Sequence, residues 1–377
     1  MNATYAKGVA AHSHVTLANT MQSVALLRSN WQQLSAIARP NIFQSFAWYS
    51  AWSEHLIADD PQPRLEPWVL ALRNNIDIVG ISPLVRRTVI RGGWHVRKLE
   101  FVTPHADYNE LTLGKEPIEL NEVILASLAE TSREWELLDL MDLRNDCGQA
   151  DQLAQAVKDA GLSFRVFDEQ AGCLYMPIDG PWIEMRTRKH LRFARRAWAA
   201  LEERACEGYR VRVIDEPHYE PGLLDRMIKV EAQKRVNGKL AKPVIGAFRD
   251  VFQKLIDELG PSRSIAVVVV EKNDTLIAWR WLYCCGNVLW DYLTAYDHAF
   301  GELSPGTLLL CAALDYGFAH GYSEFDFLRG TDAYKLRWTR TYRRNQRVLV
   351  WNRRWRSRVA ARLFLGIRRN TLASNAG

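Results

Sequence analysis

The segment from Ser304 to Thr307 has the residue types of a ligand-binding helix start. It follows a predicted strand and precedes an apolar helix expected over residues 304–320. Ser304 suits the N-cap and Pro305 the first helical position, while Gly306 lets a ligand approach the backbone closely. Free amides and the positive end of the helix dipole would form a cradle for a phosphate. The same residues also suit an ordinary turn at a helix start.

Carboxylates and tyrosines near this turn and in one polar loop are candidates for taking a proton from a nucleophile. Asp107 and Tyr108 lie in the loop 105–109, which interrupts an apolar pattern. Such loops carry either function or turn-forming hydrogen bonds, and both interpretations stay open. Asp291 and Tyr292 are neighbours on the strand before the Ser304 turn. Only one of them can face a given side of the sheet.

Other polar residues are candidates for holding a substrate. Tyr296 shares a face with Tyr292 if the strand continues, although cross-strand packing explains both rings equally simply. Glu231, Lys234 and Arg235 end a predicted helix. A lysine or arginine there could hold a phosphate or carboxylate, and a solvated helix end is the simpler interpretation.

The elements expected around these residues occur in the same order twice. Each series has a hairpin, a strand, a helix and a second strand, with patterns typical of these elements. The first series comprises 68–72, 76–85, 98–102, 120–131 and 136–141, and the second 265–271, 276–283, 288–295, 304–320 and 324–328. A repeated series of this kind predicts two related α/β halves.

The composition is that of a globular chain with two domains, with 377 residues and 48% hydrophobic content. Six cysteines are scattered without a CxxC pair, so we expect no metal site and a reducing compartment. The N-terminal residues lack the apolar core of a signal peptide, and no apolar run would span a bilayer. These features predict a cytoplasmic protein.

The net charge of +6 comes from the end of the chain. From Ala333 onward there are 13 Lys or Arg and no acidic residue, whereas the rest holds 36 basic against 43 acidic residues. A uniformly basic nucleic-acid-binding protein is therefore disfavoured. A helix is expected over 353–368, with Trp355, Val359 and Leu363 at spacings of four. It would lie on an anionic membrane surface, or pack on the body with a basic outer face.

The stretch from Ser304 to Trp338 resembles the signature of the CelD/BcsL-like acetyltransferases. That family belongs to the GNAT superfamily and is related to the Fem-type peptidoglycan aminoacyltransferases. The resemblance covers about residues 40–350 and is most specific in its C-terminal part. The matching pieces are Ser304-Pro305-Gly306, the helix to Gly321, Phe325-Asp326-Phe327, Gly330 and Tyr334-Lys335 before Trp338.

The resemblance implies an α/β (α+β) fold of two tandem GNAT-like halves. Each half would be a mixed, mostly antiparallel sheet flanked by helices. The expected divisions are an N-terminal extension (1–40), an N-terminal half (41–180), a C-terminal half with the acyl-donor site (181–350) and a basic amphipathic tail (351–377).

The resemblance further implies an acyl-CoA co-substrate, acetyl-CoA first, with no permanently bound cofactor. Its binding residues would be Ser304, Gly306, Thr307, Tyr334 and Lys335. This chain departs from standard GNAT enzymes, whose loop reads Arg/Gln-x-x-Gly-x-Gly/Ala. Here residues 301–307 read Gly-Glu-Leu-Ser-Pro-Gly-Thr. A longer acyl-CoA, an acyl carrier protein and an aminoacyl-tRNA therefore remain open as donors.

The acceptor implied by the resemblance is an amino sugar, a polysaccharide precursor or another cell-envelope intermediate. Two other functions remain open. One is a Fem-like aminoacyltransferase that uses charged tRNA, which the basic tail favours. The other is a non-catalytic subunit of a polysaccharide-synthesis complex. Apart from tRNA, no nucleic-acid partner is expected, and the tail predicts peripheral contact with the inner face of a membrane.

Overall fold

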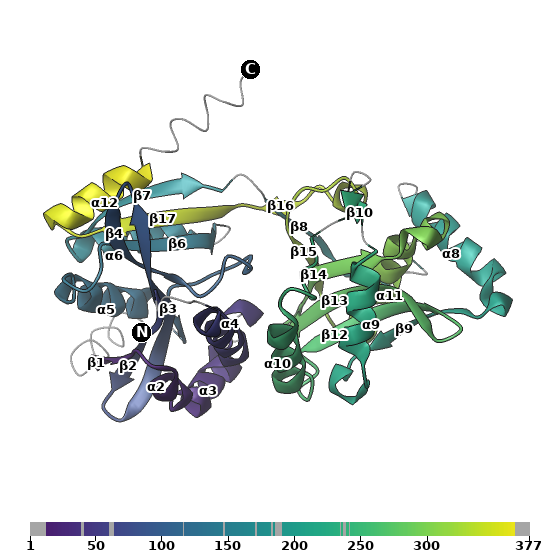
Figure 1. Ribbon diagram of the computed structural model, residues 1–377, viewed down its shortest axis with the longest axis horizontal. Helices are drawn as coiled ribbons and strands as arrows, with labels where there is room; N and C mark the ends of the chain where they lie inside the picture. Colours follow the sequence, from purple (N-terminus) through teal and green to yellow (C-terminus); the bar gives the residue numbers. More distant parts are fainter. Residues whose placement is uncertain are drawn as a thin grey trace, which may run out of the picture. The chain divides into compact units, whose positions relative to one another are not determined.

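The computed structural model divides the chain into two units (Figure 1). Unit 1 comprises Met1–Gln170 with Arg344–Gly377, and unit 2 comprises Ala171–Arg343. The residues that the structure describes are 13–38, 41–59, 64–115, 117–145, 148–169, 172–181, 184, 191–233, 235–236, 239–240 and 242–365.

Unit 1 is built on a mixed sheet with the strand order β1-β2-β3-β4-β6-β17-β7, and β5 pairs with β3. Its elements are β1 (Ser13–Ala18), α2 (Met21–Ala25), α3 (Arg28–Ala38), η1 (Ile42–Gln44), α4 (Phe46–Ala58), β2 (Leu65–Asn74), β3 (Asp77–Arg91), β4 (Trp94–Phe101), β5 (Leu113–Gly114), α5 (Pro117–Glu130), β6 (Leu137–Arg144), α6 (Gln149–Asp159), β7 (Ser163–Asp168), β17 (Asn345–Trp351) and α12 (Trp355–Leu365). Ser45 caps α4, because its side chain accepts the Trp48 N–H.

Unit 2 is built on a second sheet with the order β16-β8-β15-β14-β13-β12-β9. Its elements are β8 (Cys173–Pro177), α8 (Arg192–Glu203), η3 (Ala205–Glu207), β9 (Tyr209–Ile214), η4 (Pro217–Tyr219), α9 (Leu223–Glu231), β10 (Arg235–Val236), β11 (Lys239–Leu240), α10 (Arg249–Leu259), β12 (Ile265–Lys272), β13 (Thr275–Cys285), β14 (Val288–Tyr296), η5 (His298–Leu303), α11 (Pro305–Ala319), β15 (Glu324–Arg329), η6 (Lys335–Arg337) and β16 (Tyr342–Arg343).

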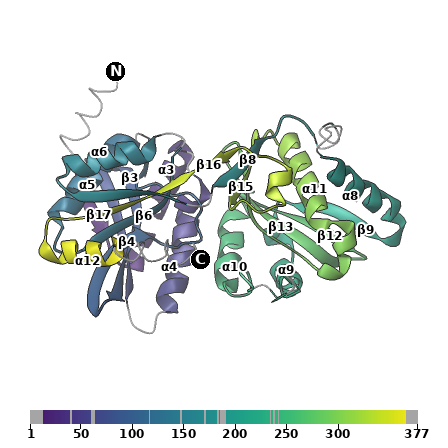
Figure 2. The same cartoon turned by 90° about the horizontal axis from the view of Figure 1, so that it is seen from above.

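Helices cover both faces of the unit 2 sheet, and the sequence of β12 explains why. Its residues Ile265 to Val270 are all buried, so neither face of this strand meets water. Helices α8 and α11 pack on one face, while α9 and α10 lie on the other (Figure 2). On the α9 and α10 face, the Trp279 indole N–H donates to the carbonyl of Met227, and the Trp281 ring meets Phe252.

The two units repeat the predicted series, and both sheets contain the same irregularity. In unit 2, β14 and β15 pair in parallel only over Val288–Trp290 and Glu324–Asp326, although both strands continue. In unit 1, β4 and β6 pair in parallel only over Lys98–Glu100 and Leu137–Asp139. In each unit two parallel strands therefore separate after three paired residues. The predicted fold of two related mixed sheets is confirmed.

The strand next to each separating pair comes from a distant part of the chain. In unit 2, β8 pairs with β15, although it follows the last strand of the N-terminal half in sequence. In unit 1, β17 pairs with β6 and β7, although it follows all the strands of unit 2. Both pairings contain a register shift, and the separating strand has a non-glycine residue with positive φ at that point. These residues are Asp142 (φ 58°) and Leu328 (φ 57°). The two units have thus exchanged equivalent strands.

This exchange moves the predicted domain boundaries. The boundary expected at 180/181 lies after β8, which belongs to unit 2, so the division comes at Gln170/Ala171. The boundary at 350/351 is replaced by one at Arg343/Arg344, and the tail belongs to unit 1. The expected N-terminal extension contains β1, which pairs along its whole length with β2. Strand pairing between distant segments is not visible in local patterns, which is why these boundaries were misplaced.

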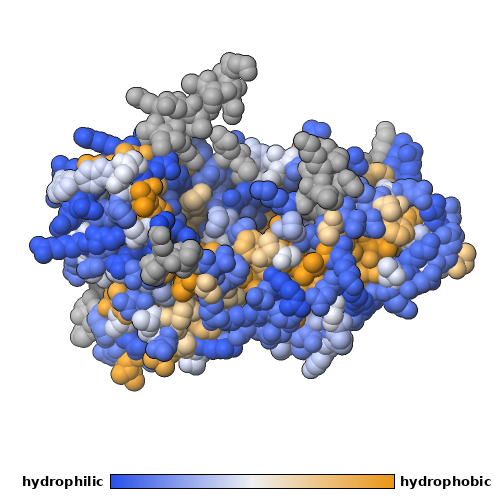
Figure 3. Space-filling model, in the orientation of Figure 1, coloured by the Kyte–Doolittle hydropathy of each residue, from blue (hydrophilic) through white to orange (hydrophobic). Residues whose placement is uncertain are grey.

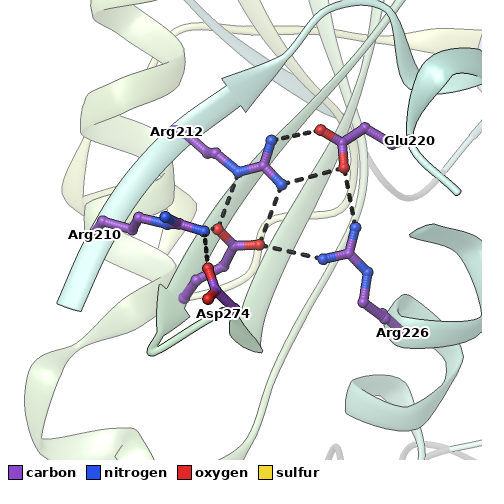
Figure 4. Close-up of polar contacts among 6 residues, drawn as sticks. Arg210, Arg212, Glu220, Arg226 and Asp274 are labelled. Atoms are coloured by element: carbon purple, nitrogen blue, oxygen red, sulfur yellow. Dashed lines mark hydrogen bonds and ion pairs between the residues drawn. The ribbon is translucent and has the colours of Figure 1, made fainter. Parts of the chain in front are cut away.

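An ion-pair network holds β9 at the edge of the unit 2 sheet (Figure 4). The buried carboxylate of Glu271 accepts hydrogen bonds from Arg210 and Arg212, at 2.9 and 3.0 Å, and lies 3.4 Å from Arg226. Glu220 also binds Arg212 and Arg226. Charged side chains along an edge strand oppose pairing with another chain.

We predict that Glu271→Gln lowers the free energy of unfolding by about 1–3 kcal/mol, because one charge-assisted acceptor serves several guanidinium groups. Burial raises the pKa of Glu271, but the hydrogen bonds from Arg212 and Arg210 outweigh it, so the pKa lies below 4.5. The stabilisation is therefore present above about pH 4.5 and is lost as the pH falls through the folded-state pKa. Urea unfolding between pH 3 and 7 measures both effects.

The control is Asp274→Asn, which removes an exposed carboxylate that accepts a hydrogen bond from Nη2 of Arg210. Its effect should stay within about 0.5 kcal/mol. Equal losses in the two variants would contradict the central role of Glu271.

Candidate functional site

The Ser304 turn lies in the junction between β14 and α11, beyond the point where β14 stops pairing with β15. The chain leaves β14, passes through the short helix η5 and enters α11 at Pro305. Pro305 occupies the first helical position, as predicted. The predicted side-chain cap is wrong, because Ser304 adopts a left-handed conformation (φ 52°) and its hydroxyl makes no capping bond. Instead, its carbonyl accepts the N–H of Thr307 at 2.8 Å.

Gly306 provides open space at the start of the helix. A Cβ added at this position would meet no atom within 4 Å. Among the described residues, no backbone hydrogen bond of the first turn uses the Gly306 N–H. The turn therefore presents a free amide at the positive end of a 15-residue helix. Its anion-binding capacity is smaller than expected, since the amide of Thr307 is already used.

A buried ion pair lies beside this turn. The guanidinium of Arg280, on β13, donates to the carboxylate of Asp291, on β14, and both side chains are almost fully buried. Arg280 also donates from Nη2 to the carbonyl of Gly306 at 3.3 Å. One side chain thus links two strands of the sheet to the first turn of α11.

Tyr334 completes this polar cluster. Its phenol lies close to the charges of Asp291 and Arg280. Burial of the phenol raises the pKa of Tyr334 well above its ordinary value, although the residue as a whole is 38% exposed. Tyr334 therefore stays protonated near neutral pH and can donate a hydrogen bond. Burial also raises the pKa of Asp291, against the opposing charges of Arg280 and Lys335.

The Lys335 side chain in this cluster is bound by backbone carbonyls and lies near one carboxylate. Its buried ammonium donates to the carbonyls of Phe327 and Arg329, at 2.9 and 2.7 Å, and lies 3.7 Å from the carboxylate of Asp332. These bonds hold the end of β15, where Leu328 has a strained positive φ. The geometry favours Lys335 as an anchor for this strand end over its predicted role with a donor phosphate.

The two tyrosines predicted on β14 lie apart from the ion pair. A register shift between β13 and β14 leaves Tyr292 between the residues that pair with Trp281 and Leu282. Its ring packs against Phe252 and Tyr283, with centroid distances of 6.3 and 5.1 Å. Tyr296 packs against His298. Bulges of this kind re-aim side chains and are frequent beside active sites, but both rings have ordinary packing environments.

The loop candidates Asp107 and Tyr108 belong to unit 1 and so lie in a different unit from Asp291. Tyr108 is 1% exposed, and the guanidinium of Arg144 lies 5.5 Å from its ring centre. The carbonyl of Asp107 accepts a 2.6 Å hydrogen bond from the Asn345 side chain, which joins this loop to β17. The pair therefore supports the packing of unit 1.

Glu231, another predicted substrate ligand, is engaged by the backbone. Its buried carboxylate accepts the N–H groups of Val244, Ile245 and Gly246 at 2.8, 3.3 and 3.0 Å. It therefore fixes the turn before α10. Lys234 lies outside the described residues, and Arg235 is described only through its backbone, in the short strand β10.

Sequence reasoning missed Arg280. The signal was present, because this arginine interrupts the apolar run Leu276–Tyr283 between two tryptophans. A charge at the centre of a buried strand requires a buried partner. Finding Asp291 as that partner requires the register of β13 and β14.

Other chemistry is not indicated in the part of the chain that the structure describes. Its His, Cys, Asp and Glu side chains form no group that could hold a metal ion. The described cysteines form no disulfide with one another, and burial raises the pKa of the thiols of Cys284 and Cys311. A cavity of about 190 Å³ in unit 2 is lined by η4 and the starts of α9 and α10, away from the Arg280 cluster.

Comparison with protein families identifies the region that contains this cluster. Residues 187–336 match the model of the acetyltransferase (GNAT) domain. The match includes β13, β14, α11, β15 and the Tyr334 loop. No curated protein sequence matches the chain. Unit 2 therefore carries a GNAT-type acyltransferase domain, and the separating strands β14 and β15 belong to it.

Solved structures share the fold over most of the chain. One is the C-terminal domain of a protein described as a lysylphosphatidylglycerol synthetase from Agrobacterium fabrum, with 12% identity, coverage of 93% of this chain and 97% of that chain, and a TM-score of 0.55. FemX has 13% identity, coverage of 85% and 95%, and a TM-score of 0.56. A conserved protein of unknown function from Bacteroides thetaiotaomicron has 11% identity, coverage of 89% and 100%, and a TM-score of 0.55. At this identity the similarity shows the fold alone.

We predict that Asp291→Asn lowers the free energy of unfolding by about 3–5 kcal/mol, because it leaves the buried charge of Arg280 uncompensated. The double variant Arg280→Met/Asp291→Leu, which removes both charges, should recover most of this loss. Urea unfolding of Arg280→Met, Asp291→Leu and the double variant gives the coupling energy between the two side chains. A loss below about 1 kcal/mol for Asp291→Asn would show that the pair does not hold the site together.

Proposed function

We propose that this chain is an N- or O-acyltransferase that uses acyl-CoA, with acetyl-CoA as the first donor to test. The observation that carries the proposal is the separation of β14 and β15 beside the open start of α11. This geometry lies within the region that matches the GNAT domain. A gap between two parallel strands admits an extended ligand, and the free amide of Gly306 can bind its anionic part.

The residues at this site fit a polar, anionic donor. Gly306 leaves room for a close approach to the backbone, and the buried Nε of Arg280 has no hydrogen-bond partner among the described residues. A buried donor without a partner costs free energy that a ligand acceptor can recover. An acyl thioester would supply an activated carbonyl carbon for attack by an amine or hydroxyl.

The transfer forms one bond from the acceptor nitrogen or oxygen to the acyl carbon and breaks the bond from that carbon to sulfur. The acceptor loses a proton and the leaving sulfur gains one. Tyr334 remains protonated at neutral pH and is partly exposed, so it can supply a proton or a hydrogen bond to the leaving group. Arg280 fixes the Gly306 turn, and its charge lies close to the phenol of Tyr334. Holding both substrates in one geometry supplies much of the remaining acceleration.

By resemblance to the CelD/BcsL-like family, we propose an amine or hydroxyl of a cell-envelope or polysaccharide precursor as the acceptor. No helix within the described ranges is long and apolar enough to cross a membrane. We further propose that the acceptor is a precursor at the cytoplasmic side. Within the same fold, charged tRNA is the alternative donor if coenzyme A does not bind.

We predict that wild-type protein binds acetyl-CoA or a longer acyl-CoA in calorimetry, and that Gly306→Trp weakens this binding at least about ten-fold, or 1.4 kcal/mol. The tryptophan side chain would start in open space, because an added Cβ at Gly306 meets no protein atom within 4 Å. Gly306→Ala is the matched control, because a single methyl fits there and alanine favours the helix. Its affinity should stay within about two-fold of wild type.

Two results would overturn parts of this proposal. If a folded Gly306→Trp variant binds acyl-CoA as wild type does, the donor does not lie on α11. If wild type binds none of the acyl-CoAs, the coenzyme A version fails, and binding of charged tRNA becomes the next measurement.

For catalysis, we predict that Tyr334→Phe lowers kcat by about 10²–10⁴ with little change in the KM for the donor, because it removes a proton donor and keeps the ring. Thiol release from acetyl-CoA with glucosamine as a probe acceptor measures both constants. Tyr342→Phe is the control, since Tyr342 is a 49% exposed tyrosine in the same unit. An equal loss in both variants would exclude a specific role for Tyr334.

A further inference from the structure

An exposed aromatic pair in unit 1 is surrounded by arginines. Trp94, at the tip of the β3–β4 hairpin, meets Trp355, at the start of α12, with ring centres 5.7 Å apart and planes at 82°. Trp94 is 38% and Trp355 61% exposed. The guanidinium of Arg356 lies about 6 Å from both ring centres. Two exposed tryptophans in contact form a contiguous patch, and such patches mark interaction surfaces more than scattered exposed residues do.

The outer face of α12 continues this patch with positive charge. Trp355, Arg358 and Arg362 are exposed and lie on one face of the helix, at spacings of three and four. Arg354, just before the helix, is also exposed. No described carboxylate pairs with Arg354, Arg358 or Arg362. At the edge of the patch, the buried Glu136 binds Arg97 and lies 3.5 Å from Arg356.

The apolar side of α12 is not available to a partner. Ala360 and Ala361 are buried against Val96, Leu137 and Leu349 of the unit 1 sheet, and Leu363 lies beside the hairpin turn at Gly92. The predicted stripe is therefore only partly correct, because Leu363 lies against the hairpin turn whereas Trp355 is exposed. What the structure leaves outside is a basic face with two tryptophans, and Figure 3 shows strongly hydrophilic side chains beside apolar ones in the region of α12.

We propose that this Trp94–Trp355 patch docks unit 1 on an anionic lipid bilayer. Tryptophan prefers the interface between lipid headgroups and acyl chains, and unpaired arginines attract anionic headgroups by charge. The fit is one of charge complementarity, because no described carboxylate pairs with Arg354, Arg358 or Arg362, and the nearby Glu136 is buried and bound by Arg97. This inference goes beyond acyl transfer and does not depend on which donor is used.

The test is flotation of the full chain with vesicles of phosphatidylcholine containing 30% phosphatidylglycerol, compared with pure phosphatidylcholine vesicles. Wild type should bind the anionic vesicles and lose binding in high salt. Arg358→Glu/Arg362→Glu should weaken binding about 25-fold or more, since each basic residue near the surface contributes about five-fold. Trp355→Ala should weaken binding to a smaller but measurable extent.

Matched controls come from unit 2. Arg195→Glu/Arg196→Glu makes the same charge change on exposed arginines of α8, and Tyr219→Ala removes a ring that is 73% exposed. Both should bind anionic vesicles within about two-fold of wild type. Thermal unfolding of each variant verifies that the surface substitutions leave the fold intact.

Three results would overturn the inference. The first is failure of the wild type to float with anionic vesicles at low salt, and the second is a loss of binding in the unit 2 variants as large as in the patch variants. The third is that the patch substitutions abolish tRNA binding while vesicle binding persists. That result would assign the surface to nucleic acid.

Discussion

The buried ion pair between Arg280 and Asp291 is the interaction on which the candidate site depends. Arg280 binds a carboxylate on the neighbouring strand and the carbonyl of Gly306 on α11, and its charge lies close to the phenol of Tyr334. A buried charge is tolerated only where it is paired and hydrogen-bonded. The pair therefore couples the stability of the sheet to the position of the helix start. Binding of any ligand at Gly306 depends on this ion pair.

The same constraint explains why the two strands can separate. Parallel strands that stop pairing leave backbone groups without partners, and those groups need other bonds. In unit 2 the ammonium of Lys335 binds the carbonyls of Phe327 and Arg329, and the carboxylate of Asp326 accepts the N–H of Leu328. Arg343 then binds Asp326 at 2.9 Å. Charged side chains thus replace the missing strand pairing, which accounts for so many buried ionic groups near the gap.

The exchange of β8 and β17 ties the two units together through the chain itself. Unit 1 completes its sheet with β17, which follows all of unit 2 in the chain, and unit 2 contains β8, which precedes the predicted boundary at residue 180. Neither half of the sequence therefore contains a full sheet, and a truncation at the predicted boundary near residue 180 would remove strands from both units. The basic end of the chain has the same origin, since β17 and α12 are parts of unit 1 that follow unit 2 in sequence.

The sequence by itself determined the repeated order of elements, the absence of a bilayer-spanning run and the place of the Ser304–Thr307 helix start. These follow from local periodicity and from residues such as Pro305 and Gly306, whose preferences are set by their own backbone. Only the tertiary structure decided that Arg280 binds Asp291, that Glu231 and Lys335 are engaged by the backbone, and that the apolar side of α12 faces inward. These outcomes depend on strand register and on pairing between distant segments, which bring together residues that no local pattern relates.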